Sequence, residues 1–90
     1  MTDHEEALVA GILRTLTKVL IKGRLQGHEP DDFIRDPDYH FDRVIRHITT
    51  ARLMGRGDQG TDDEGVSGHL ENALVRMAMG LYCYNEGLHK

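Results

Sequence analysis

The sequence predicts an all-α fold of three helices, and three observations support this class. Apolar residues recur at spacings of three and four in three separate stretches. Segments that contain glycine and proline separate those stretches. Ninety residues, of which 39% are hydrophobic, correspond to one small domain at most. We therefore expect a single compact helical domain over residues 1–90, with helices near 3–24, 37–54 and 66–86.

The first helix is predicted over residues 3–24. Thr2 or Asp3 can cap its start, because both side chains can accept a backbone hydrogen bond there. Gly27 and Pro30 end it, since proline cannot continue a helix. Its apolar stripe consists of Leu8, Val9, Ile12, Leu13, Leu16, Val19 and Leu20.

The second helix is predicted to begin at Asp36-Pro37. Aspartate is a good N-cap, and the fixed φ of proline suits the first helical position. We expect Phe33 of the preceding connector to pack against the core, and Gly55 to cap the far end in a left-handed conformation. The apolar stripe is Phe41, Val44, Ile45, Ile48 and Ala51, and His40, His47 and Met54 lie along its edge.

The third helix is predicted from Val66 to Glu86. Thr61 and Glu64 fit a capping box at its start, with Ser67 as the alternative cap. Its main stripe is Leu70, Ala73, Leu74, Met77, Leu81 and Tyr84, and a second apolar patch consists of Val75, Met79 and Tyr82. A helix that is apolar on two sides is buried on two sides. We therefore expect a homo-oligomer that forms through the second patch and completes the small core.

Charge and composition narrow the class of protein. The formal net charge is −4 and the pI is near 5.8, so a nucleic-acid partner is not expected. A single cysteine excludes an internal disulfide. No apolar run approaches the roughly 18 residues of a membrane-spanning helix. We expect a cytoplasmic protein without a membrane partner, and a phage protein made in the cytoplasm of a cell fits equally well.

Histidines flank an acidic loop, and this is where the sequence predicts chemistry. His47 and His69 come from the second and third helices, and Asp62, Asp63 and Glu64 come from the loop. Imidazole and carboxylate together suit Mn²⁺ or Zn²⁺, and carboxylate with water suits Mg²⁺. The sequence also fits a plainer alternative, in which the histidines edge the core and the acidic residues solvate the loop.

A phosphate site is the second hypothesis. His69, Asn72 and Arg76 share one face of the third helix, whose start offers free backbone N–H groups. Those amides, with Arg46 or Arg76 and a histidine, would suit a phosphate. The alternative is a structural network that links the two helices.

The residues around the loop resemble a known family. Arg46-His47-Ile48, then Asp62-Asp63-Glu64-Gly65, then His69-Leu70-x-x-Ala73 is similar to the pattern of small all-α phage and bacterial dATP/dGTP diphosphohydrolases. The resemblance covers roughly residues 43–84. It implies a nucleotide pyrophosphohydrolase-related activity that uses Mg²⁺ or Mn²⁺. If the site residues of that family are carried over to this sequence, the metal and phosphate site consists of His47, Asp62 or Asp63, Glu64 and His69. The resemblance implies that His47 and Glu64 take part in catalysis.

These observations lead to function hypotheses of different classes. The first is a metal-dependent nucleotide phosphohydrolase, or a nucleotide-binding derivative of one. The second is a non-catalytic helical module, possible for a phage-encoded protein, that sequesters a small anionic ligand or binds a partner protein. The third is a purely structural oligomer. Metal dependence and turnover distinguish the first hypothesis from the others.

Overall fold

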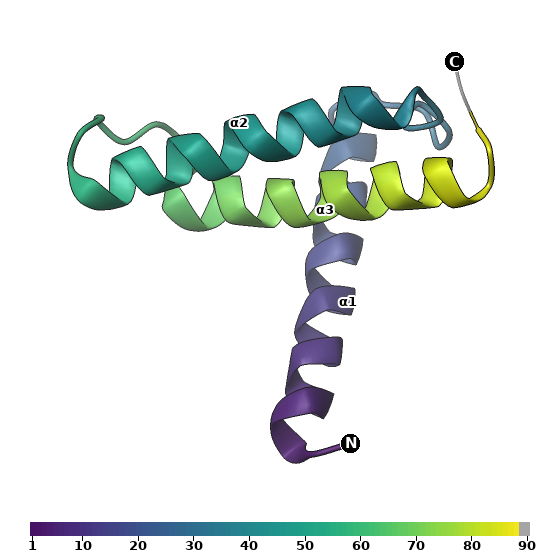
Figure 1. Ribbon diagram of the computed structural model, residues 1–90, viewed down its shortest axis with the longest axis horizontal. Helices are drawn as coiled ribbons and strands as arrows, with labels where there is room; N and C mark the ends of the chain where they lie inside the picture. Colours follow the sequence, from purple (N-terminus) through teal and green to yellow (C-terminus); the bar gives the residue numbers. More distant parts are fainter. Residues whose placement is uncertain (89–90) are drawn as a thin grey trace. The chain divides into compact units, whose positions relative to one another are not determined.

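A computed structural model, which describes residues 1–88, confirms the all-α fold. It contains α1 (Asp3–Leu25), α2 (Pro37–Arg56) and α3 (Gly65–Asn85), and the described residues include no strand (Figure 1). The chain divides into two compact units, one from Met1 to Pro30 and the other from Asp31 onward.

The first unit is built on α1, and local hydrogen bonds define both of its ends. The hydroxyl of Thr2 accepts from the N–H of Glu5 at 3.1 Å, and the Glu5 carboxylate accepts from the N–H of Thr2 at 2.7 Å. This capping box confirms Thr2 as the cap. At the other end Gly27 has a φ of +95°, and the N–H of His28 donates to the carbonyl of Gly23. That hydrogen bond belongs to a Schellman ending, which needs a left-handed residue. No residue of α1 is buried.

In the second unit, α2 begins as predicted and ends later than predicted. Asp36 is the N-cap, and its carboxylate accepts from the N–H of Asp38 at 3.0 Å, with Pro37 at the first position. The predicted cap at Gly55 is wrong, because the helix continues to Arg56 and Gly57 takes the left-handed conformation, with a φ of +79°. Both glycines can adopt a positive φ, so composition alone did not distinguish them.

The start of α3 also differs from the prediction. Neither Thr61 nor Ser67 caps the helix. Instead one carboxylate oxygen of Asp62 accepts from the N–H groups of Glu64 and Gly65, both at 3.0 Å. Gly65 has a φ of +68°, a conformation that favours glycine. The loop is therefore fastened to the first turn of α3 by a single aspartate.

Helices α2 and α3 lie side by side in opposite directions (Figure 1). Their shared core is small: the buried apolar side chains are Val44, Ala51, Met54, Ala73, Val75 and Cys83. Gly80 permits the close approach, since a Cβ atom there would lie 2.5 Å from Cε1 of Phe41. Two helices that approach this closely have little freedom to slide, so their contact fixes which residues face one another.

The connector before α2 closes one end of this helix pair. The carbonyl of Phe33 lies 2.7 Å from Nε2 of His40 and 3.4 Å from the sulfur of Cys83, and both donate to it. The ring of Phe33 packs against Tyr82, with the ring centroids 5.8 Å apart. Phe33 is half-buried, which confirms that it packs against the core.

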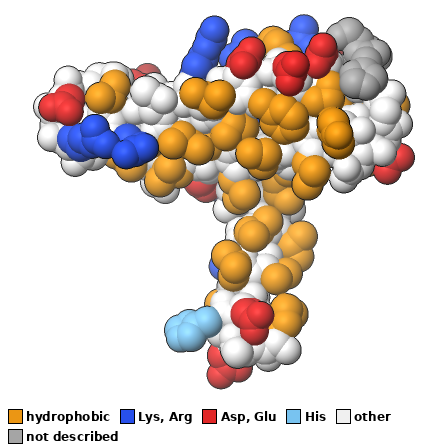
Figure 2. Space-filling model, in the orientation of Figure 1, with side chains coloured by type: hydrophobic (Ala, Val, Ile, Leu, Met, Phe, Trp, Pro, Cys, Tyr) orange, Lys and Arg blue, Asp and Glu red, His pale blue; other side chains and the backbone are white. Residues whose placement is uncertain are grey.

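The apolar surface of the second unit is distributed differently from the predicted oligomer patch. Val75 is 2% exposed, so it belongs to the core of the unit. Tyr82 packs on Phe33 but remains 49% exposed, and Met79 is half-buried. The exposed apolar side chains of α2 and α3 include Ile45, Ile48, Leu70, Met77 and Leu81, and Figure 2 shows hydrophobic side chains gathered over these helices. Homo-oligomerisation stays a prediction, but Val75 is not available for it.

No described helix is long and apolar enough to cross a membrane.

Candidate metal centre

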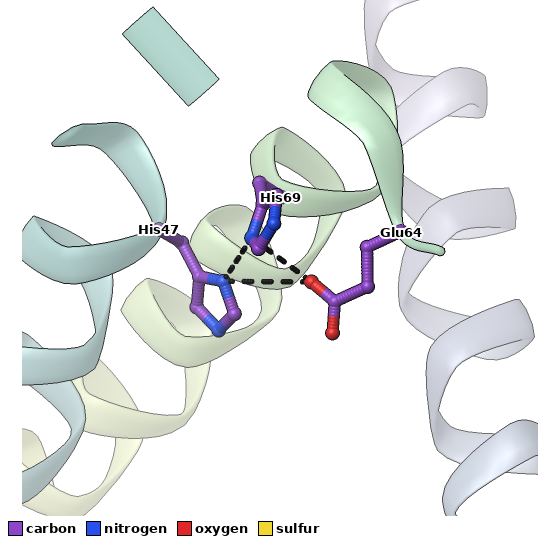
Figure 3. A group of neighbouring side chains, drawn as sticks. All are labelled: His47, Glu64 and His69. Carbon is purple, nitrogen blue, oxygen red and sulfur yellow. Dashed lines mark hydrogen bonds and ion pairs between the residues drawn. The ribbon is translucent and has the colours of Figure 1, made fainter. Parts of the chain in front are cut away.

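His47, from the middle of α2, meets Glu64 and His69 at the start of α3 (Figure 3). His47 lies in the third turn of α2, His69 in the second turn of α3, and Glu64 immediately before α3. Nδ1 of His69 lies 2.9 Å from Nδ1 of His47 and 2.9 Å from Oε2 of Glu64. Nδ1 of His47 lies 3.9 Å from the same carboxylate oxygen. Two helices and the loop each contribute one ligand-type atom.

The spacing of these three atoms matches the coordination sphere of a small divalent cation. A point equidistant from all three lies about 2.0 Å from each, as the three separations of 2.9, 2.9 and 3.9 Å require. Imidazole nitrogens and carboxylate oxygens bind Zn²⁺ at about 2.0–2.2 Å. An ion at this point would lie in the plane of the three atoms, with the His47 and Glu64 atoms on nearly opposite sides, so the side chains would have to shift to give a tetrahedral geometry.

The hydrogen bond of His69 with Asp62 directs the other imidazole nitrogen into the centre. Nε2 of His69 lies 2.7 Å from Oδ2 of Asp62 and donates its proton there. A neutral His69 then carries a bare lone pair on Nδ1, the atom that faces His47 and Glu64. A carboxylate that accepts from a ligand histidine is the usual outer partner in protein metal sites. Asp62 thus orients His69 while it also fastens the start of α3.

The electrostatic surroundings favour the neutral form of His47. Burial lowers the pKa of His47, and the positive charges of Arg76 and Arg43 and the neighbouring His69 lower it further, whereas Glu64 opposes them. The hydrogen bond from His69, followed by the N–H groups of the loop, lowers the pKa of Asp62. The lowered pKa of His47 favours its unprotonated imidazole at neutral pH, which is the form that binds metals.

The other residues that the sequence nominated occupy different places. Asp62 contacts His69 rather than the centre itself, and Asp63 is exposed and takes no part in the cluster. Arg46 is also exposed and outside the cluster. The side-chain amide of Asn72 donates to the carbonyl of Gly68 in its own helix, at 3.0 Å. The fold therefore does not bring Asp63, Arg46 or Asn72 into the cluster of the two histidines.

Arg76 belongs to a second cluster, further from the loop. Its guanidinium donates to Nδ1 of the buried His40 at 3.2 Å and lies over the ring of Tyr39. Arg35 and Arg43 also lie over that ring. This cluster was not predicted from the sequence. The spacing of four places Tyr39 and Arg43 on one face of α2 and could have indicated that pair, whereas Arg35 lies in the connector before the helix.

No protein-family model, no curated protein and no solved structure matches this chain. A functional assignment must therefore come from the chemistry of the residues themselves. Two imidazoles and one carboxylate leave part of a metal's coordination sphere open to water or a ligand, as in catalytic rather than structural metal sites.

Proposed function

We propose that this protein is a metal-dependent nucleotide phosphohydrolase, or a derivative that binds nucleotides without hydrolysing them. The observation that supports it most directly is the convergence of three ligand atoms from His47, His69 and Glu64 around one point. The resemblance of the loop and its flanking residues to dATP/dGTP diphosphohydrolases supplies the substrate class.

The donor set indicates which metal to test first. Magnesium prefers oxygen ligands and keeps several waters, whereas imidazole suits zinc and iron, and a mixed set of imidazole and carboxylate also suits manganese. Two of the three donors are imidazole nitrogens. We therefore expect Mn²⁺ or Zn²⁺ to bind more tightly than Mg²⁺.

The site residues would act mainly by holding the metal. Bound metal would neutralise charge on a phosphoanhydride and lower the pKa of a coordinated water. His47 and Glu64 would fix the ion from one helix and from the loop, and Asp62 would hold the ring of His69 in its ligating orientation. The positive side chains of Arg43 and Arg76, which act electrostatically on His47, would balance the charge of a phosphate ligand.

Calorimetric titration with Mn²⁺ and Zn²⁺ tests the metal site directly. We expect wild type to bind one ion per chain, and His69→Ala to weaken that binding at least 100-fold without loss of helical content. His4→Ala is the matched control, because it removes an exposed histidine from the other unit. Equal affinity in wild type and His69→Ala would exclude the site.

Turnover is a separate question. Incubation with dATP or dGTP and Mn²⁺, followed by chromatography of the nucleotides, should show products that His69→Ala does not form. Metal-dependent nucleotide binding without products would identify the binding derivative. Absence of both would leave the nucleotide assignment without support, whatever the metal affinity.

We propose as the second candidate a non-catalytic helical module that associates with another copy of itself. The exposed apolar side chains of α2 and α3, among them Leu70, Met77 and Leu81, favour it. Light scattering at micromolar concentration should then give more than one chain per particle, and Leu81→Glu should reduce it because a charge would enter an apolar interface. A monomeric wild type would contradict this candidate.

A further inference from the structure

Three guanidinium groups surround one tyrosine ring on the second unit. The Cζ atoms of Arg35, Arg43 and Arg76 lie 3.9, 4.6 and 5.8 Å from the ring centroid of Tyr39. Cation–π contacts of this kind attract each guanidinium to the ring. They do not remove the mutual repulsion of the three positive charges, and Arg43 and Arg35 both lower the pKa of Arg76.

Arg76 is the most informative member of this group. It is half-buried, and its one hydrogen-bonding side-chain partner is the neutral ring of His40, at 3.2 Å. Burial lowers the pKa of Arg76, Arg43 and Arg35 lower it further, and only Tyr39 opposes them. No carboxylate is among the groups that act on it. Charged side chains are seldom buried without a partner of opposite charge, and the only group that raises the pKa of Arg76 is Tyr39.

Arg43 adds an independent observation. Its Nε atom is buried and has no hydrogen-bond partner, and among the described residues it is the one buried side-chain nitrogen or oxygen in that state. A buried donor without an acceptor costs about 1–3 kcal/mol. An acceptor that drew the guanidinium of Arg43 toward itself would remove this cost.

The arginine cluster and the histidine cluster lie on the same side of the helix pair. Arg43 precedes His47 by one turn of α2, and Arg76 follows His69 by two turns of α3, which runs in the opposite direction. Both arginines act electrostatically on His47. A ligand that carries more than one negative group could therefore extend from one cluster toward the other.

We propose that Arg43 and Arg76, supported by Arg35 and Tyr39, form a binding site for a phosphate group that is distinct from the metal centre. Guanidinium groups match the geometry of phosphate oxygens with paired N–H donors, which ammonium groups do not. The phosphate can belong to free phosphate or polyphosphate, or to a nucleotide. The site itself does not require a metal, so it stands independently of the proposed enzymatic activity.

Titration with inorganic phosphate and pyrophosphate in the presence of EDTA tests this site. We expect wild type to bind both anions, and pyrophosphate more tightly, because a second phosphate group can reach the remaining guanidinium. Arg43→Gln and Arg76→Gln should each weaken binding at least tenfold. Arg46→Gln is the matched control, since it removes the same charge from an exposed position of the same helix as Arg43 and should change affinity less than twofold.

Two further variants keep the test independent of folding and of the metal site. Arg43→Lys retains the charge but not the paired donors, so it should fold normally, as judged by circular dichroism, and still lose most of the affinity. His69→Ala should bind phosphate as wild type does, even where it no longer binds metal. No phosphate binding by wild type, or an equal loss in Arg46→Gln, would overturn the proposal, because general positive charge would then explain the result.

The same titrations distinguish whether the phosphate group belongs to a nucleotide or to a polyphosphate. Inorganic triphosphate and dATP carry the same phosphate chain, so a clear preference for dATP would assign the site to a nucleotide. Equal affinities would assign it to polyphosphate. Both results require the arginine cluster and support the proposed phosphate site.

Discussion

His40 and His47 lie seven residues apart on α2, and their partners Arg76 and His69 lie seven residues apart on α3. The two pairs are thus equivalent by position along an antiparallel helix pair, yet their surroundings are opposite in kind. His40 is fully buried, whereas the side chain of His47 is 21% exposed. His40 donates through Nε2 to the carbonyl of Phe33 and accepts at Nδ1 from Arg76, so both nitrogens are satisfied.

The His47 pair has different partners: one hydrogen bond joins Nδ1 of His47 to Nδ1 of His69, and the Glu64 carboxylate approaches the same atom of His69. Nδ1 of His69 faces both an imidazole nitrogen and a carboxylate oxygen, each of which is a hydrogen-bond acceptor in its unprotonated form. An added proton or a metal ion would resolve this arrangement. Helical spacing places both histidines at the interface of α2 and α3. The atoms that each histidine contacts there decide whether its role is structural or chemical.

Replacement of His40 should give the largest effect on stability. His40→Ala would leave a cavity and would remove the shorter of the two hydrogen bonds to the carbonyl of Phe33. It would also leave the Arg76 guanidinium without its hydrogen bond to His40. We expect a loss of about 2–4 kcal/mol in the free energy of unfolding. Urea denaturation followed by circular dichroism measures it. Metal affinity of the folded variant should stay near that of wild type. A His40→Ala protein as stable as wild type would remove the distinction between the two histidines.

Replacement of Asp62 should give an intermediate effect, on metal affinity. Asp62→Asn removes the carboxylate that holds the ring of His69, and changes to such outer partners cost about 10–100-fold in metal affinity. Calorimetric titration with Zn²⁺ measures the change. Asp63→Asn is the control, because Asp63 is exposed and outside the cluster. If both variants bound Zn²⁺ as wild type does, Asp62 would have only its role at the start of α3.

The dependence of stability on pH should give the smallest effect. Burial is the main cause that lowers the pKa values of His40 and His47 below their ordinary value of 6.5. The unfolded chain therefore binds more protons than the folded protein just below that pH. The stability from these two groups is complete above pH 6.5 and is lost as the pH falls from there toward their lower folded values.

Urea denaturation of the metal-free protein between pH 7.5 and 5 should show this loss, and His40→Gln should show a smaller one. Added Zn²⁺ should stabilise the protein at neutral pH and less in acid, since protons compete for the ligand nitrogens. Stability that rises as the pH falls through this range would contradict the neutral state of both histidines.

The sequence by itself determined the three helices and two of their starts. Thr2 with Glu5, and Asp36 with Pro37, are local signals whose hydrogen bonds form within a single turn, so no distant residue is needed to predict them. The sequence also nominated His47, Glu64 and His69, because histidine and carboxylate beside one loop is a pattern that spacing alone reveals.

The tertiary structure decided which of the nominated residues meet. Arg76 follows His69 by seven residues on α3, as the sequence analysis used. The alignment of α2 against α3, however, brings Arg76 into contact with His40 and Tyr39 and not with the metal centre. That alignment depends on the close contact of Gly80 with Phe41, which joins residues 39 apart and has no local signature. Asp62 replaced Thr61 at the start of α3 for a similar reason, because it can bind the helix start and His69 together. Helices form from local periodicity, whereas a site forms where distant side chains are fixed within a few ångströms by packing.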